Sequence, residues 1–228
     1  TRYIQNKYGV EADIQPTDEY SVEEKNGDAF SDFYIREKGI KQLREMSSVK
    51  AYQVSGELDE YLEAHLIEGT VSSSAFIELA RSFKTTVGVL CAAVYIKAVI
   101  LGMNKSEKRR HVVVSVPVNL RQYFKSGTAR NFFGVINIDY NADDYDGDLN
   151  KLIAFADKAF REKLSPENIE KTMNSYSALE HNLAIKMVPL PIKDFVIGFV
   201  DGMVKRGITS TMSNLGQINM PEEIADYI

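Results

Sequence analysis

The residues best suited to chemistry lie where two apolar segments of the chain follow one another. The first segment ends in Pro-Val-Asn-Leu-Arg, so Asn119 and Arg121 close a run of β-branched residues. The second segment opens with Asn131, Phe132 and Phe133. A guanidinium group keeps its charge and offers five N–H donors in a fixed fork, and a carboxylate or backbone carbonyls usually hold it.

Two interpretations of these side chains remain open. In the first, Asn119 and Asn131 satisfy backbone groups of the loop between the segments, and Arg121 pairs with a nearby acid. In the second, they contact a substrate directly. We expect Arg121 to be partly buried and to make at least two hydrogen bonds to loop atoms. Because Phe132 and Phe133 are adjacent in a predicted strand, one of them should lie in the core.

The histidines and the cysteine show no spacing typical of a catalytic or metal site. His65, His111 and His181 lie far from one another in the sequence and form no cluster with Cys91, so a zinc site is not predicted. His65 begins "HLIEG", and a strand residue with a local structural role is the better interpretation. Cys91 lies in the apolar segment "VLCAAV", where a cysteine behaves as a small core residue.

An acidic segment, "NADDYDGDLN" over residues 141–150, resembles a calcium-binding loop. Aligning Gly147 with the central glycine of such a loop puts Ala142 at the first ligand position and Ile153 at the last, where a bidentate glutamate is needed. Neither side chain can bind calcium. We therefore predict a turn whose last aspartate, Asp148, caps the following helix.

The charge and composition exclude several classes of partner. Of the 228 residues, 44% are hydrophobic and 26% are charged, with a formal net charge of -5. An acidic chain lacks the broad basic face that nucleic-acid binding needs. The one dense basic stretch, "KSEKRR" over residues 105–110, is predicted to be a solvated loop rather than a phosphate site.

The sequence also bears on the compartment in which the protein works and on the cofactors that it binds. No apolar stretch reaches about 18 residues without a charge, so no membrane span is expected. A single cysteine allows no internal disulfide bond, which favours a reducing, cytoplasmic compartment. No phosphate loop, dinucleotide fingerprint or Gly-x-Ser-x-Gly elbow occurs. No metal or redox cofactor is expected.

The spacing of apolar residues predicts helices alternating with strands, and this pattern favours an α/β fold with a mixed sheet flanked by helices. Strands are predicted over residues 49–56, 63–72, 110–120, 131–140 and 207–216. Helices are predicted over residues 74–83, 85–103, 148–164, 165–186 and 192–205. The second of these helices is apolar nearly all round, which predicts a buried helix. Residues 13–30 are polar and predict a linker or a surface loop.

Three motifs carry a family resemblance. They are "SVPVNLR" (115–121), "ARNFFGVINI" (129–138) and "TSTMSNLGQINMP" (209–221). In this order they resemble the alcohol acetyltransferase-like branch of the condensation-domain superfamily, which has the chloramphenicol acetyltransferase fold. The resemblance also takes in "RYIQNKYG" (2–9) and "FIELARSFKTTVGVLCAAVYIKAV" (76–99), and so covers most of the chain.

The resemblance implies one lobe of a two-lobed fold. Enzymes of this superfamily carry a His-His-x-x-x-Asp-Gly motif in their first half, where one histidine is the general base, and this chain has no such motif. The chain is therefore expected to be the second half. Residues 1–48 are expected to be a helix and a polar linker that enter from the first lobe. Residues 49–228 are expected to be the second lobe, truncated at its C-terminus.

In this fold the two halves enclose a tunnel in which an acyl thioester meets its acceptor. The side chains expected near the tunnel, or bracing it, lie at predicted strand ends: Asn119, Arg121, Asn131, Phe132, Phe133, Ser213 and Asn214. The resemblance implies that one of the two phenylalanines lines the tunnel. It also implies that Arg121 helps to brace the catalytic motif through an aspartate of the first lobe.

Two functions follow as expectations. The first is part of an acyltransferase that takes acyl-CoA or another acyl thioester as substrate and acylates an alcohol or an amine. The histidine of the other lobe would be the base, so the chain alone is expected to be inactive. The alternative is a non-catalytic binding or assembly module of the same fold. Because an apolar face would be exposed where the other lobe is missing, we also expect a homo-oligomer.

Overall fold

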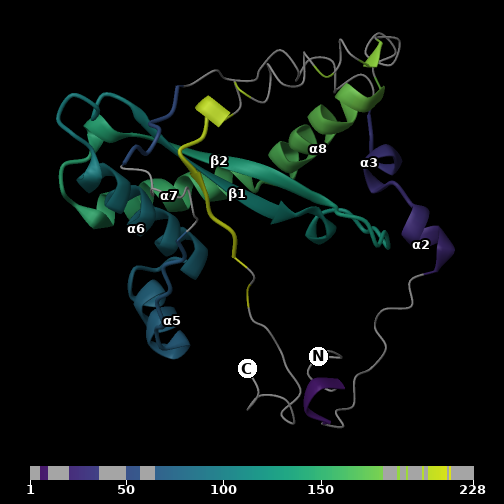
Figure 1. The fold of residues 1–228 in the computed structure, drawn as a ribbon, viewed down its shortest axis with the longest axis horizontal. Coiled ribbons are helices and arrows are strands. Elements are labelled where there is room, and N and C mark those ends of the chain that lie inside the picture. Colours follow the sequence, from purple (N-terminus) through teal and green to yellow (C-terminus); the bar gives the residue numbers. More distant parts are fainter. Residues whose placement is uncertain are drawn as a thin grey trace.

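A three-stranded mixed sheet organises the described part of the chain (Figure 1). The computed structural model describes residues 6–9, 21–35, 50–56, 65–181 and 205–214, together with residues 189, 190, 194, 202 and 216. The strands are β1 (His111–Asn119), β2 (Phe133–Asn141) and β3 (Ser210–Thr211), in the order β2-β1-β3. The fold class is therefore α/β with a mixed sheet, as the sequence predicts.

The central strand, β1, fixes the register of the sheet. It pairs with β2 in antiparallel orientation over its whole length, from His111 opposite Asn141 to Asn119 opposite Phe133. On its other edge it pairs with β3 in parallel orientation, where Val114 lies opposite Ser210. The strands β1 and β3 therefore run in the same direction, toward the end of the sheet at which β2 begins.

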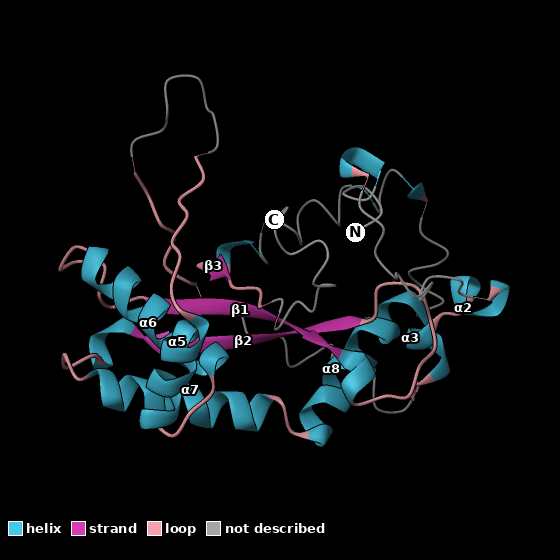
Figure 2. Ribbon diagram, turned by 90° about the horizontal axis from the view of Figure 1, so that it is seen from below, coloured by secondary structure: helices cyan, strands magenta, loops and turns pink. Residues whose placement is uncertain are grey.

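Helices cover one face of this sheet (Figure 2). The helices are α2 (Val22–Asn26), α3 (Ala29–Asp32), α5 (Ser73–Ser82), α6 (Val87–Gly102), α7 (Leu149–Lys163) and α8 (Pro166–His181). Two short 3-10 turns, η1 (Leu120–Gln122) and η2 (Ala142–Asp144), follow β1 and β2. Helix α6 packs on β1 and on α7, while α7 and α8 pack on β2.

Polar side chains just before the helices set where they begin. Thr86 accepts a hydrogen bond from the backbone N–H of Val89, and Asp148 accepts one from Asn150. The Asp148 cap is as predicted from the sequence. The cap of α5 is Ser72. Helix α8 begins at Pro166, whose missing N–H costs nothing at that position.

The core lies between the sheet and these helices. Side chains alternate along the strands, so Val112, Val114 and Val116 share one face of β1, and Ile136 and Ile138 share the same face of β2. These residues pack with buried side chains of the helices: Leu90, Ala93, Ile96, Ile100, Leu152, Ile153, Ala156, Ile169 and Met173. Burial of this apolar surface is the main force that holds the sheet on the helices.

Three strand predictions need correction. The expected strand over residues 207–216 is shortened to β3, Ser210–Thr211. The expected strand over residues 63–72 is wrong for residues 65–72, which form no strand and leave Ile67 95% exposed. An isolated apolar segment has no stable strand conformation without a partner to pair with. The expected strand over residues 49–56 is reduced to a single bridge between Ala51 and His111.

The prediction of a linker or surface loop over residues 13–30 is wrong for residues 22–26, which form α2, and for residues 29–30, which begin α3. Helix α3 is fastened to α8 by two buried polar side chains. Asn174 accepts a hydrogen bond from the backbone N–H of Ile35 at 2.7 Å, and the Ser177 hydroxyl donates to the Phe30 carbonyl oxygen at 3.0 Å. Tertiary hydrogen bonds thus order a segment whose composition alone predicts a loop.

Helix α6 is buried on one side only, so the prediction of a helix buried all round is wrong. Val94 and Leu101 are 45% and 67% exposed.

No single helix in the described residues is long and apolar enough to cross a membrane. Helices α5 and α6, bent by 83° at the break between them, meet the criteria of length and composition only as a pair. The helix predicted over residues 192–205 falls almost wholly outside the described residues.

Replacing Ile138 by alanine should destabilise the fold strongly. Its side chain is fully buried between the sheet and the helices, so the variant leaves a cavity and should lower the free energy of unfolding by about 3 kcal/mol. Urea unfolding followed by circular dichroism measures this. Asn137→Ala, at the exposed neighbouring position, is the control and should cost less than about 1 kcal/mol. Equal losses would contradict the assignment of the core face.

Candidate functional site

The candidate site is the end of the sheet where β1 passes into β2 (Figure 1). Asn119 is the last residue of β1, and Phe133 lies opposite it as the first residue of β2. The loop that joins them contains Arg121 and Asn131. Helix α3 lies at this end, and a chain of hydrogen bonds described below ties α2 to the loop.

Asn119 and Leu120 turn the chain out of β1. The Asn119 side chain accepts a hydrogen bond from the backbone N–H of Arg121 at 3.1 Å and so caps η1. The Leu120 side chain is fully buried, and its backbone N–H donates to the Phe132 carbonyl oxygen at 3.2 Å. Asn119 therefore satisfies a loop backbone group, as the first interpretation expects. Asn131 is exposed.

Arg121 ties the two sides of the loop together. Its Nη2 atom donates to the carbonyl oxygen of Thr128 at 2.9 Å and to that of Arg130. The expected pair of hydrogen bonds to loop atoms is confirmed. The expected partial burial is wrong, because the side chain lies at the exposed end of the sheet. Within the described residues carbonyl oxygens, and not an acid, hold this guanidinium group.

Thr128 links the loop to α2, a contact that the sequence analysis missed. Its side chain is 7% exposed, and its hydroxyl donates to the Gly27 carbonyl oxygen at 2.7 Å and accepts from the Arg130 N–H at 3.2 Å. The backbone N–H of Ala129 donates to the Glu24 carbonyl oxygen at 2.8 Å. No local pattern signals these partners, because about 100 residues separate them in the sequence.

A capping box holds α2 in this position. The Ser21 hydroxyl accepts from the Glu24 N–H at 3.1 Å, and the Glu24 carboxylate accepts from the Ser21 N–H at 2.7 Å. These hydrogen bonds from Ser21 lower the pKa of Glu24, since they favour its charged form. The Glu24 carboxylate is therefore ionised at neutral pH, and in this form it accepts the Ser21 hydrogen bond that completes the capping box.

The two phenylalanines have opposite environments. Phe132 is 1% exposed and packs edge-on against Phe30, with ring centroids 5.0 Å apart and planes at 84°. Phe33 and Phe124 complete this aromatic cluster. Phe133 is 48% exposed. The expectation that one of the pair belongs to the core is confirmed, and a tunnel wall at Phe133 stays a prediction.

Gly134 is a further residue of the site that the sequence analysis did not single out. A side chain at this position would have its Cβ 3.2 Å from Cδ2 of Leu120 and 3.5 Å from Cγ2 of Thr172 on α8. The glycine thus allows the start of β2 to pass close to both. A glycine within a predicted strand is the signal that could have revealed this close approach.

Ser213 and Asn214 follow β3 and are both exposed. The Asn214 side chain accepts a hydrogen bond from the Gly216 N–H at 2.8 Å. Its Nδ2 atom lies 3.9 Å from the position of a Cβ atom built on Gly88, so it passes beside the first turn of α6. Within the described residues no hydrogen bond joins this pair to the Arg121 loop, and β3 pairs with Val114 and Ser115 in the middle of β1.

The three histidines and the cysteine are the remaining candidates from the sequence. His111 Nδ1 is 2.6 Å from Asp139 Oδ1, at the opposite end of β1 from Arg121. His65 is exposed, and the His181 side chain is outside the described part. Burial raises the pKa of the Cys91 thiol, which disfavours a nucleophilic thiolate. Among described residues no group of three or more His, Cys, Asp or Glu side chains is arranged to hold a metal ion.

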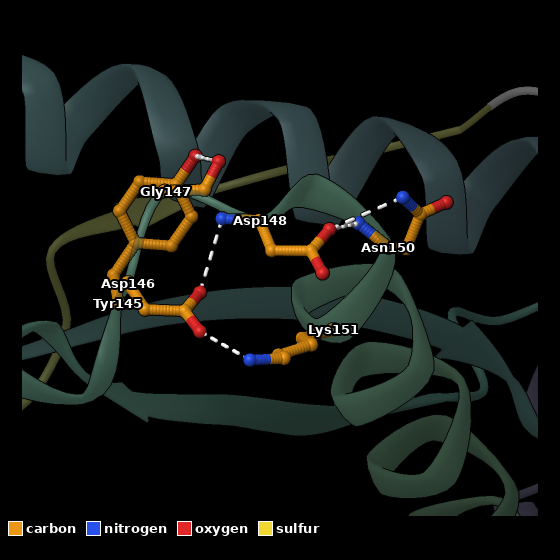
Figure 3. Close-up of polar contacts among 6 residues, drawn as sticks. All are labelled: Tyr145, Asp146, Gly147, Asp148, Asn150 and Lys151. Atoms are coloured by element: carbon orange, nitrogen blue, oxygen red, sulfur yellow. Dashed lines mark hydrogen bonds and ion pairs between the residues drawn. The ribbon is translucent and has the colours of Figure 1, made fainter.

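The acidic turn after β2 is structural (Figure 3). Asp146 accepts from the backbone N–H of Asp148 at 3.0 Å and pairs with the Lys151 ammonium group. Those two contacts, with the Lys151 contribution the larger, lower the pKa of Asp146. Asp148 accepts from Asn150 at 2.8 Å as the helix cap. The turn predicted in place of a calcium loop is confirmed.

The Arg121 end of the sheet can bind and orient another group, but Arg121 cannot take up a proton from a substrate. A guanidinium group does not release its proton near neutral pH, so Arg121 cannot act as a base. Both hydrogens of its Nη2 are used on the loop, while Nε and Nη1 have no partner in the described part of the chain. These atoms can donate to a carboxylate or carbonyl group presented from outside.

Comparison with known proteins assigns no relative to the chain. No family model matches it, and neither does any curated protein or solved structure.

Arg121→Ala should loosen the loop and lower stability modestly. It removes two hydrogen bonds from a charged donor, which in an exposed position should cost on the order of 1 kcal/mol. Amide hydrogen exchange should become faster for residues 123–130 and stay unchanged in α7. Gln122→Ala, at the next exposed position, is the control and should leave the exchange unchanged. Faster exchange in the control alone would contradict the role given to Arg121.

Proposed function

We propose that the chain is one lobe of a thioester-dependent acyltransferase with a chloramphenicol acetyltransferase-like fold. One observation carries the proposal. The three motifs that resemble this superfamily, although up to about 100 residues apart, belong to the three neighbouring strands β2, β1 and β3 of one mixed sheet. Neighbouring strands of one sheet are what a common tunnel wall requires.

The proposed reaction transfers an acyl group from coenzyme A, or another thiol, to an alcohol or an amine. A histidine of the other lobe removes a proton from the acceptor, whose oxygen or nitrogen then attacks the thioester carbonyl carbon. The tetrahedral intermediate collapses, the carbon–sulfur bond breaks, and the thiolate takes up the proton. This lobe supplies a wall and orientation, and it needs no metal or redox cofactor of its own.

Within this proposal Arg121 has a bracing role. Its Nη2 is anchored on the loop, so its Nε and Nη1 are held at the end of β1. They are placed to receive an aspartate from the other lobe. Phe133, exposed opposite Asn119, is the aromatic side chain proposed to line the tunnel.

The protein at its full natural length should release free coenzyme A from acyl-CoA when alcohols or amines are added. A thiol-reactive dye measures this release, with acceptor-free reactions as the control. The isolated 228-residue chain should release none, because the base is expected in the other lobe. A full-length protein that carries the His-His-x-x-x-Asp-Gly motif, but turns over no thioester with a broad panel of acceptors, would contradict the proposal.

The alternative is a non-catalytic binding or assembly module, and one observation favours it. All the hydrogen bonds that the side chains of Arg121 and Thr128 make among described residues hold the loop together or tie it to α2, as in a purely structural unit. The sequence of the other lobe separates the two functions. An intact base motif supports the enzyme, and a degenerate motif supports the module.

We also propose that the isolated chain forms a homo-oligomer. Helix α6 exposes Val94, Tyr95 and Leu101, and a second copy that covered them would remove apolar surface from water. Light scattering at high concentration should give a mass above one chain. Leu101→Glu should lower that mass, whereas Lys125→Glu, an exposed position outside α6 that serves as the control for added negative charge, should not. A strictly monomeric wild-type chain would contradict the expectation.

A further inference from the structure

A basic hollow lies at the other end of β1 from the Arg121 loop. Its volume is about 700 Å³, within the range of small-molecule sites. Because β1 has nine residues, roughly 25 Å separate the two ends. Six polar side chains from three separate segments line the hollow: Lys50, Gln53, Arg109, Arg110, His111 and Arg206.

Backbone contacts bring these segments together. Ala51 bridges His111, and the backbone N–H of Tyr52 donates to the His111 carbonyl oxygen at 2.7 Å. The Ala51 N–H donates to the Arg206 carbonyl oxygen at 3.0 Å. Ala51 and Tyr52 are 4% and 5% exposed, so their packing fixes the position of this edge. The convergence of basic residues is therefore built into the fold.

A side-chain contact strengthens the same junction. The Gln53 amide Nε2 donates to the carbonyl oxygen of Ile208 at 2.9 Å, across 155 positions of the sequence. The backbone of Thr209 in turn donates to the Val113 carbonyl oxygen at 2.8 Å. The segment that carries Arg206 is thus held against the start of β1 from two sides.

The charges of the hollow are not balanced. Lysine and arginine side chains are cationic at neutral pH, and among the described residues none of Lys50, Arg109, Arg110 and Arg206 has an acidic partner. Only His111 contacts an acid there, namely Asp139. Other basic side chains of the chain are paired, as in Lys151–Asp146, Arg161–Asp157 and Lys171–Glu167. Four like charges around one hollow repel one another unless an anion lies between them.

We propose that this hollow binds a small ligand with two or more phosphate groups, of the nucleoside diphosphate class. Guanidinium groups match phosphate oxygens in geometry and charge, and several of them from different directions suit neighbouring phosphates. The net charge of -5 disfavours a long polyanion such as nucleic acid, which would also meet the acidic remainder of the surface. The proposal is independent of acyl transfer, because it concerns the opposite end of the sheet.

Isothermal titration of the full chain with pyrophosphate and with ADP at low ionic strength tests the proposal. Each should bind at one site, and affinity should fall as salt is added. The double variant Arg109→Gln/Arg110→Gln should bind at least about tenfold more weakly, as expected for the loss of charged contacts. Arg206→Gln, on a separate segment, should also bind more weakly. Lys105→Gln removes one positive charge, as Arg206→Gln does, but from a position outside the hollow, and it should change affinity less than about twofold.

Circular dichroism of each variant shows whether it is folded, and Arg206→Gln provides the test if the double variant is not. The absence of binding up to about 1 mM of either probe would overturn the proposal. So would an equal loss in Lys105→Gln, which would point to net charge alone. Tighter binding of a single-stranded oligonucleotide than of ADP would overturn the assignment to a small ligand.

Discussion

The antiparallel register between β1 and β2 is the constraint on which the other features depend. Nine consecutive residues of β1 each face one residue of β2. A slip of one residue would turn Val112, Val114 and Val116 away from α6 and α7, and with them the apolar surface that they bury. The same register fixes the two ends of the sheet, since it sets Asn119 opposite Phe133 at one end and His111 opposite Asn141 at the other.

The two ends use their basic side chains differently. At the Arg121 end, the loop is internally satisfied, because Arg121 and Thr128 provide donors for carbonyl oxygens of the loop and of α2. At the His111 end, Lys50, Arg109, Arg110 and Arg206 converge, and none of these four has an acidic partner among the described residues. The hydrogen bonds at the Arg121 end stabilise the conformation of the loop. The cations at the His111 end create a local positive potential in an acidic protein.

The elements with strong local signals could be predicted from the sequence. β-Branched runs indicated β1 and β2, and the cap Asp148 indicated where α7 begins. Features that depend on distant partners could not be predicted. Helices α2 and α3 are short and polar, and contacts from Thr128 and Asn174 order them. The apolar residues at 65–72 indicated a strand, but they have no strand to pair with. The stretch "KSEKRR" was predicted to be a solvated loop rather than a phosphate site, whereas Arg109 and Arg110 at its end line the basic hollow together with residues from distant segments of the chain.

Nuclear Overhauser contacts between backbone protons of β1 and its neighbours test this account most directly. The account predicts that Ser115 contacts Asn137 in antiparallel register and Thr211 in parallel register. Those contacts would place the three motifs on neighbouring strands, with the Arg121 loop at one end of β1 and the basic hollow at the other. A register shifted by one residue, or the absence of any contact between Ser115 and Thr211, would contradict it.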